Sequence, residues 1–382
     1  MAKSTFMRIF IAVVALFLSN LLVGQTIGSW PNSRGNIQLH GTTSVTFPQQ
    51  VKLKWTFDAD GIFKSAPVIS EGKIVVGSTN GTLYCLNLKG DSIWGFKTDN
   101  AIEAPALIDN GAVYFGNLSG SLFALNLNTG KKIWEYKTEN QIMGAPTLFK
   151  NGTQTILAVG SYDYYLHGVD AKTGKGLWKY ESDNFLNSAP AMWNGNAVFG
   201  GCDGFLHLVN MKNGQSSGKV EIATYVASSP AVSGNLAYIG DYDGGFTCID
   251  LTSKSIKWRY TNPDNDLPFI ASPSLVNDKI LIGSRDKMMY CFNRHSGELL
   301  WKKNTGSRVD ASTIANQKQV LLINMRGDLM LLNLSDGSVV WNYQLGAAAI
   351  NAPAVIDNAI VVAGSDGNVY LLASPAPSLG GE

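Results

Sequence analysis

Charged residues are scarce in this 382-residue chain, where Asp, Glu, Lys and Arg together make up 15% of the sequence. The 30 basic residues nearly balance the 29 acidic ones, so the formal net charge is only +1 at pH 7. A surface so close to neutral offers no electrostatic attraction to nucleic acid or to an anionic membrane. The composition therefore argues against nucleic acid as a partner.

Residues that carry metal and nucleophilic chemistry are also few. The chain has four cysteines, none of them adjacent, and four histidines. It contains neither a His-Glu-x-x-His zinc motif nor a Gly-rich phosphate loop. The acidic cluster Asp264-Asn265-Asp266 lacks the spacing of a calcium loop and is interpreted as a solvated turn. We therefore expect no catalytic residue, no metal site and no bound cofactor.

The chain is instead rich in one pattern that repeats about every 40 residues. Each copy has a small residue, usually followed by proline, then apolar runs joined by a glycine turn, and then, in most copies, a tryptophan. A period of this length with four strand-like runs per copy is typical of a β-propeller blade. The copies open at Ala66, Ala104, Ala145, Ala189, Ser229, Ser272, Ser312 and Ala352.

Each blade is expected to hold four antiparallel strands. In the first blade the innermost strand is predicted to include Pro67, because an edge strand tolerates a residue that cannot donate. The turn at Asn80-Gly81 favours a hairpin in which both residues have positive φ. The four strands of this blade are predicted at residues 65–69, 73–78, 82–87 and around Trp94.

The two ends of the repeat region complete each other. Residues 51–58 form an outermost strand with no inner strands before it, and residues 352–373 supply three inner strands with no outer strand after them. Joined, they make the eighth blade and close the ring, which leaves no open sheet edge. The predicted fold class is all-β, an eight-bladed β-propeller of four-stranded antiparallel blades over residues 51–373.

Tryptophan recurs in the outermost strand, where a large flat ring fills the space that widens toward the rim. One blade has Gly218 at this position. We expect a looser rim there, or compensation by Trp193. The recurring residues are Trp55, Trp94, Trp134, Trp178, Trp258, Trp301 and Trp341.

Other unusual residues fall at packing positions of the repeat. Cys85, Cys248 and Cys291 share one small apolar position, so we expect free, buried thiols rather than disulfides. His167 and His207 fall where other blades have Tyr or Phe, which indicates packing rather than metal binding.

Residues 1–24 are predicted to be an export signal. Lys3 and Arg8 are followed by an apolar run over residues 9–23. This run is shorter than the ~20 residues that span a bilayer, so we expect no transmembrane segment after signal removal; an uncleaved anchor is the alternative. The mature protein would be periplasmic, or at the cell surface or secreted. The other predicted units are an N-terminal extension over 25–50 and a short polar tail over 374–382.

The link between the third and fourth strands resembles that of a known family. Residues 124–134 and 168–178 are similar to the tryptophan-docking motif of quinoprotein-type, PQQ-like propellers. The resemblance extends from about residue 30 to residue 373. Such repeats build both pyrroloquinoline-quinone (PQQ) dehydrogenases and the outer-membrane protein assembly factor BamB, a non-enzymatic scaffold.

The resemblance to PQQ dehydrogenases implies certain cofactor-binding features, which can be looked for in this sequence. They hold PQQ under adjacent half-cystines and bind calcium through Glu, Asn and Asp. Here no Cys-Cys pair exists, and the long capping insertions of those enzymes are missing. PQQ and calcium therefore belong only to an alternative hypothesis, a PQQ-dependent oxidoreductase.

The leading hypothesis is an exported, non-catalytic, BamB-like interaction scaffold in the cell envelope, monomeric and bound to an envelope or outer-membrane protein. Loops that enter the innermost strands are expected to surround one mouth of the channel and to bind this partner. The long loop 261–270 is expected to expose two apolar side chains, or to fold them back over the channel. The candidate partner-binding residues are Lys64, Glu103, Asn187, Leu267, Phe269, Arg308, Asp310 and Asn351.

A further alternative is a secreted glycan-binding propeller, which needs exposed aromatic side chains near the mouth. The candidates for this role are Tyr162, Tyr164, Tyr165 and Tyr225.

Overall fold

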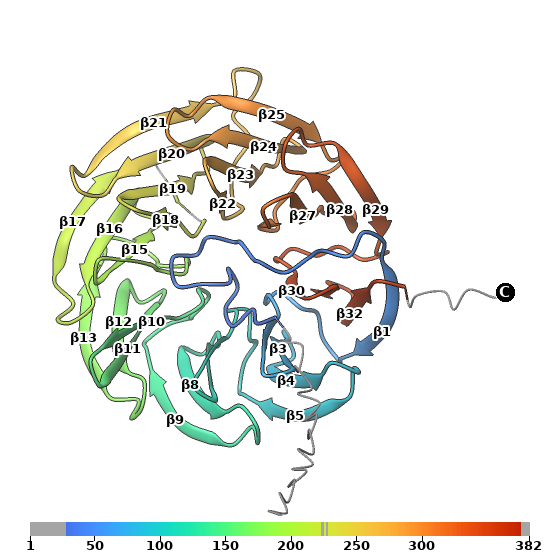
Figure 1. Cartoon of the computed structure of the whole chain (residues 1–382). Coiled ribbons are helices and arrows are strands. Elements are labelled where there is room, and N and C mark those ends of the chain that lie inside the picture. Colours follow the sequence, from blue (N-terminus) through green and yellow to red (C-terminus); the bar gives the residue numbers. More distant parts are fainter. Residues whose placement is uncertain (1–27, 223–224, 227, 376–382) are drawn as a thin grey trace, which may run out of the picture.

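The computed structural model describes residues 28–222, 225–226 and 228–375. Within these residues, 32 strands form eight four-stranded antiparallel sheets, and no helix occurs. The sheets are arranged around a central channel as the blades of a propeller (Figure 1). The predicted fold class is confirmed. The predicted export signal lies outside the described residues, as does most of the predicted tail.

In each of the first four blades, the strands follow chain order from the innermost to the outermost. Blade 1 is β2 (Val68–Ser70), β3 (Lys73–Gly77), β4 (Thr82–Asn87) and β5 (Ser92–Lys97). Blade 2 is β6 (Leu107–Asp109), β7 (Ala112–Gly116), β8 (Ser121–Asn126) and β9 (Lys132–Lys137). Blade 3 is β10 (Thr147–Asn151), β11 (Gln154–Gly160), β12 (Tyr165–Asp170) and β13 (Gly176–Glu181). Blade 4 is β14 (Ala191–Trp193), β15 (Asn196–Gly200), β16 (Phe205–Asn210) and β17 (Ser216–Glu221).

Blades 5 to 7 follow the same chain order, whereas the outermost strand of blade 8 comes from the start of the chain. Blade 5 is β18 (Ala231–Ser233), β19 (Leu236–Gly240), β20 (Gly245–Asp250) and β21 (Ser255–Thr261). Blade 6 is β22 (Ser274–Val276), β23 (Lys279–Gly283), β24 (Met288–Asn293) and β25 (Leu299–Asn304). Blade 7 is β26 (Ile314–Ala315), β27 (Gln319–Ile323), β28 (Asp328–Asn333) and β29 (Val339–Gln344). Blade 8 is β30 (Ala354–Ile356), β31 (Ala359–Ala363), β32 (Asn368–Ala373) and β1 (Lys52–Asp58).

The ring is closed by the two ends of the repeat region, as predicted. Strand β1 pairs antiparallel with β32, from Lys52 opposite Ala373 to Asp58 opposite Asn368. Because the second and third strands of every blade are covered on both faces by neighbouring blades, they are almost wholly apolar and buried. The core is therefore a series of apolar layers between adjacent blades.

Two local predictions were wrong. Pro67 lies just before β2 rather than within it, because the strand begins at Val68 once an N–H is available for the ladder. At the Asn80-Gly81 turn only Gly81 has positive φ, +85°. Asn80 instead uses its side chain, whose Oδ1 accepts from the Thr82 N–H at 2.8 Å. This is a wider turn with a single left-handed residue.

The outer tryptophans fill the space between blades at the rim, as predicted, and six of the seven bond to the next blade, whereas Trp341 bonds to Pro48 just before β1. The indole N–H of Trp134 donates to the Ala171 carbonyl at 2.9 Å, and the ring lies against Gly174. A Cβ at Gly174 would lie 2.7 Å from the ring, so the position requires glycine. The acceptors for all seven outer tryptophans are the carbonyls of Leu88, Leu127, Ala171, Met211, Arg294, Leu334 and Pro48, at 2.9 to 3.2 Å.

In the blade that lacks an outer tryptophan, a lysine side chain from the next blade covers the position of the missing ring. A Cβ at Gly218 would lie 2.7 Å from Cε of Lys254, whose aliphatic stem therefore covers this position. Lys254 itself has positive φ, at the place where most other blades have glycine. The expectation that Trp193 compensates is wrong, because Trp193 lies in the innermost strand β14.

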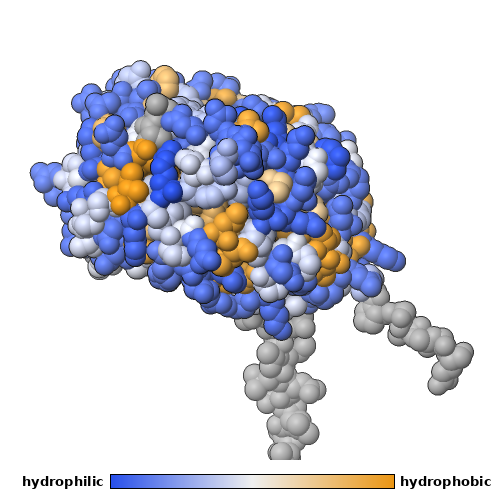
Figure 2. Space-filling model, turned by 90° about the horizontal axis from the view of Figure 1, so that it is seen from above, coloured by the Kyte–Doolittle hydropathy of each residue, from blue (hydrophilic) through white to orange (hydrophobic). Residues whose placement is uncertain are grey.

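The outer surface carries separated apolar side chains. Figure 2 shows the ring edge-on, with small apolar patches divided by hydrophilic residues. The outermost strands of seven blades each expose one large apolar side chain, one or two residues before the docked tryptophan in the sequence. They are Leu53, Ile93, Ile133, Leu177, Ile256, Leu300 and Val339.

The N-terminal segment, residues 28–50, crosses the middle of the ring (Figure 1). Its backbone bonds to the exposed edges of six innermost strands, for example between Trp30 and Ile69 in both directions at 2.8 Å. Carbonyl oxygens of Pro31, Ile37, Gln38, His40 and Gly41 accept from strands β6, β14, β18, β22 and β26. The segment therefore pairs part of the channel-facing edge in six of the eight blades.

Candidate functional site

The candidate partner-binding residues predicted from the sequence lie at one end of the channel. We define the loop face as the loops from each outermost strand to the next innermost strand, with the hairpins between second and third strands. Because strands alternate in direction, all of these connections lie at the same end of the ring. The N-terminal segment approaches from the opposite end, where it bonds to the first hairpins of blades 7 and 8, at Asn316 and Asn358.

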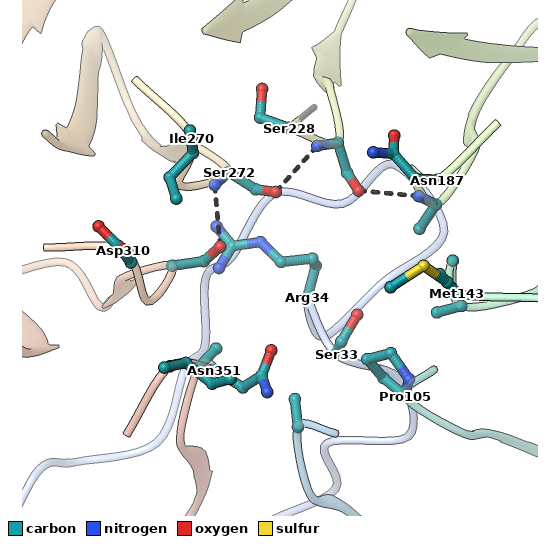
Figure 3. Close-up of a pocket in the computed structure, with 18 of the residues that line it drawn as sticks. Ser33, Arg34, Pro105, Met143, Asn187, Ser228, Ile270, Ser272, Asp310 and Asn351 are labelled. Atoms are coloured by element: carbon teal, nitrogen blue, oxygen red, sulfur yellow. Dashed lines mark hydrogen bonds between the residues drawn. The ribbon is translucent and has the colours of Figure 1, made fainter. Parts of the chain in front are cut away.

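A cavity of about 380 Å³ occupies the channel at the loop face. We call it the channel pocket. Asn187, Asp310 and Asn351 line it, which confirms that they lie at the mouth. Ser33 and Arg34 of the N-terminal segment also line it, and Figure 3 shows Arg34 in the middle of the lining residues. Sequence reasoning missed both, because no repeat pattern marks the segment.

Two more candidates pair with each other beside the pocket. Lys64 Nζ lies 2.8 Å from Oε1 of Glu103, and the Lys64 side chain is 40% exposed. The amide Nδ2 of Asn351 donates to the Lys64 carbonyl, so Lys64 links the loops before blades 1, 2 and 8. These three residues form one hydrogen-bonded group on the loop face.

Arg308 and Asp310 form a second polar group, with a partner that the sequence did not reveal. Arg285 Nη2 lies 3.2 Å from Oδ2 of Asp310, and Arg308 Nε lies 3.5 Å from the same oxygen. Arg285 comes from the hairpin between β23 and β24 and also lies over the ring of Tyr242, 5.9 Å from its centroid. Arg308 stays exposed.

The long loop 261–270 exposes only one of its two apolar candidates. Leu267 is 44% exposed, as predicted. The expectation that Phe269 is exposed is wrong, since it is 1% exposed and packs 5.4 Å from the Tyr290 ring centroid. Gly240 makes room for it, because a Cβ there would lie 2.6 Å from the Phe269 Cβ. Asp264 in the same loop is solvated, as expected.

Aromatic side chains gather on the loop face of blades 3 to 5. Tyr162 stacks on Phe185 with centroids 4.6 Å apart, and Tyr164 lies 5.1 Å from the same ring. Tyr225 packs edge-on against Tyr242, 4.5 Å between centroids. Tyr162, Tyr164 and Tyr225 were among the candidates predicted from the sequence, whereas Phe185 and Tyr242 were not.

Tyr164 has a strained backbone. Its φ is +74°, at the hairpin position where six other blades have glycine with positive φ. A bulky residue in the left-handed region costs energy that glycine avoids. The side chain is 43% exposed, so its contact with Phe185 offsets only part of the strain. Tyr165, by contrast, points toward Lys179 and His167 in its own blade.

The two repeat-position histidines are buried in hydrogen-bonded chains. His167 Nε2 lies 3.0 Å from Oδ2 of Asp163, and Nδ1 lies 3.0 Å from the Tyr136 hydroxyl. His207 of blade 4 repeats this arrangement with Asp203 of its own blade and Tyr180 of blade 3. Burial acts to raise the pKa of Asp163, but the hydrogen bond from His167, with others, outweighs it and lowers the pKa to about 2. The His and Asp side chains of both pairs are almost wholly buried, which agrees with packing positions.

The sequence contains one hydrolase-like motif that was not among the predicted sites, and its structural setting does not suit catalysis. Residues 214–218, Gly-Gln-Ser-Ser-Gly, fit the Gly-x-Ser-x-Gly spacing of a hydrolase nucleophile. That motif needs a sharp turn from a strand into a helix, whereas Ser216 begins the outermost strand β17. The described residues contain no helix to follow it.

The four cysteines are free and buried, as predicted. Burial raises the pKa of the Cys85, Cys248 and Cys291 thiols to about 12, so they are neither ionised nor reactive at neutral pH.

Comparison with known proteins identifies the family. The family model described as outer membrane protein assembly factor BamB matches residues 48–141, 79–303 and 285–374, which together span all eight blades. The chain belongs to this family. Its PQQ-like, BamB-type repeats are thereby established.

Individual relatives of the BamB family are distant. BamB of Yersinia pestis is 24% identical over 123 residues, which cover 31% of this chain and 31% of that protein. The crystal structure of BamB from Moraxella catarrhalis has a TM-score of 0.71 at 19% identity and covers 85% of this chain and 100% of that one. The quinohemoprotein alcohol dehydrogenase of Comamonas testosteroni has a TM-score of 0.75 at 12% identity, covering 92% and 82%. These structural likenesses show a shared fold alone.

A quinone–calcium centre does not fit the channel pocket. Calcium takes roughly six to eight oxygen ligands, many of them carboxylates. Among the described residues, no group of three or more His, Cys, Asp or Glu could hold a metal ion. Asp310, a carboxylate of the pocket, is already paired with Arg285 and Arg308.

Proposed function

We propose that this chain is an exported, non-catalytic propeller that serves as a docking scaffold in the assembly of outer-membrane proteins. The observation that carries the proposal is the match of the BamB family across all eight blades. The described residues also include no helix able to cross a membrane. The scaffold would act in the periplasm or at the membrane surface, through its contacts with an envelope protein.

The loop face supports this role because it combines the residue types that dominate protein interfaces. Tyr164, Tyr242 and Leu267 are apolar side chains there that remain 43%, 36% and 44% exposed. Arg308 lies on the same face and is exposed. Tyr and Arg are enriched among residues that carry binding energy, and exposed strain as at Tyr164 is typical of functional sites.

The partner is expected to be held mainly by short-range apolar contacts rather than by long-range electrostatic attraction. The loop face presents both signs of charge, in the Lys64–Glu103 pair and in the group around Asp310. With a formal net charge of +1, electrostatic steering is weak. A loop or edge strand with an apolar side chain is the partner chemistry that suits this face, and binding should depend little on salt.

Site-specific photo-crosslinking tests the proposal. A photoreactive residue replaces Leu267 on the loop face, and in a matched variant it replaces Ile133 on the outer rim, which is 53% exposed. In intact cells, the variant at position 267 should capture a component of outer-membrane protein assembly, and the variant at 133 should not. Equal capture from both positions, or none from 267, would contradict the proposal.

The glycan-binding alternative has weaker support. Tyr162 and Phe185 stack on each other at 21°, and Tyr225 meets Tyr242 at 80°. These contacts leave fewer open ring faces on which a sugar could stack. The oxidoreductase alternative lacks the acidic ligands that its calcium requires.

A further inference from the structure

Arg34 is a buried cation held in one orientation. Its residue exposure is 3%. Nη1 donates to the Thr313 carbonyl at 2.7 Å, and Nη2 donates to the Pro273 carbonyl at 2.6 Å and to Oγ of Ser274 at 3.1 Å. Gly41 packs so closely that a Cβ there would clash with Nη2. The guanidinium is therefore fixed between blades 6 and 7 by neutral acceptors.

No described residue neutralises this charge. Burial lowers the pKa of Arg34 to about 9, so the side chain still carries its charge at neutral pH. Asp310, across the pocket, is paired with two other arginines. Nε of Arg34 is buried and has no acceptor among the described residues. A buried charge without a carboxylate partner is costly, and an anion bound beside it would offset that cost.

Three serines add hydrogen-bond donors to the same pocket. Oγ of Ser229, Ser272 and Ser312 accepts a backbone N–H from the preceding blade, at 2.9, 3.1 and 2.9 Å (Figure 3). Among the described residues, none of the three hydroxyls donates a hydrogen bond, so within this part of the chain each proton is free for a ligand. The other five blades have alanine at this position, so the fold does not require serine there.

We propose that the channel pocket binds a small organic anion through its carboxylate or phosphate group. Nε of Arg34 and the hydroxyls of Ser229, Ser272 and Ser312 supply the donors. Asp310 would repel a second negative group on its side of the pocket, whereas Met143 and Ile350 offer apolar wall. The ligand is therefore one with a single anionic head and an uncharged or apolar remainder that fits a cavity of about 380 Å³.

Calorimetric titration of the mature protein at low ionic strength tests this site. The probes are inorganic phosphate, acetate and hexanoate, which separate phosphate from carboxylate recognition and measure the value of an apolar tail. Saturable binding of at least one probe is expected. Because a charge-assisted hydrogen bond is lost, Arg34→Met should weaken that binding roughly tenfold to a hundredfold.

A second variant keeps the test decisive if Arg34→Met fails to fold. The triple variant Ser229→Ala, Ser272→Ala, Ser312→Ala installs the residue that the other blades carry, so it should fold, and it should also weaken binding. Lys212→Met removes one charge from an exposed loop far from the pocket and should leave binding unchanged. No saturable binding of any probe, or equal affinity in the wild type and the folded variants, would overturn the proposal.

Discussion

Docking of the outer tryptophans can be tested most sharply at Trp134. It is 8% exposed, its indole donates to the Ala171 carbonyl at 2.9 Å, and its ring covers Gly174. Trp134→Phe keeps an aromatic ring but removes the hydrogen bond and some contact area. Tyr114 also donates to the Ala171 carbonyl, at 3.4 Å, so this oxygen keeps one partner. We expect a loss of about 1–2 kcal/mol in the free energy of unfolding.

Trp134→Ala removes the whole ring and opens a cavity between blades 2 and 3. The expected loss is about 3–5 kcal/mol. Trp94, which is more exposed than Trp134, serves as the comparison, and its substitution to alanine should cost less. Urea unfolding followed by far-ultraviolet circular dichroism measures all three variants. If Trp134→Phe stays within about 0.3 kcal/mol of the wild type, or costs as much as Trp134→Ala, docking as described is wrong.

Three further predictions concern strain, pH and cofactor binding. Lys287 has φ +71° at a hairpin position where most blades have glycine, so Lys287→Gly should raise the free energy of unfolding by about 1 kcal/mol in urea. Tyr164→Gly should raise the free energy of unfolding less than Lys287→Gly, because the contact with Phe185 is lost. Equal increases in the two variants would show that this contact does not stabilise the fold. The pKa of Asp163 is depressed in the folded state, so its contribution is present above its ordinary pKa of 3.8 and lost as pH falls toward 2. Asp163→Asn should flatten the fall in stability between pH 4 and pH 2 relative to the wild type, and an unchanged pH profile would refute the His167–Asp163 account. Titration with PQQ and calcium should give neither tight binding nor dye reduction with alcohol or sugar donors, and turnover would overturn the non-catalytic proposal.

The repeat made most of the fold predictable. Blade number, strand order and closure follow from features that recur in register, such as the opening alanine or serine and the outer tryptophan. The hairpin at Asn80-Gly81 was mispredicted, because the dipeptide suits two turn types and the side-chain bond from Asn80 to Thr82 decides between them. The docking of Lys254 on Gly218 was also missed, because it joins two blades.

The candidate site was harder to predict because its partners come from distant parts of the chain. The mouth position of Asn187, Asp310 and Asn351 followed from the register. Burial of Phe269 did not, since it depends on the space left by Gly240. Arg34 lies 279 residues from the Thr313 carbonyl that it contacts, and no periodic pattern connects them.

The proposed role of the loop face is to serve the assembly of outer-membrane proteins. Its most direct test is the abundance of outer-membrane proteins in cells that lack the chain and carry a variant copy. We predict lowered abundance without the chain, restored by the wild type and by the rim variant Ile133→Asp, but not by the loop-face variant Leu267→Asp with Arg308→Glu. Unchanged abundance without the chain, or full restoration by the loop-face variant at equal expression, would contradict the account.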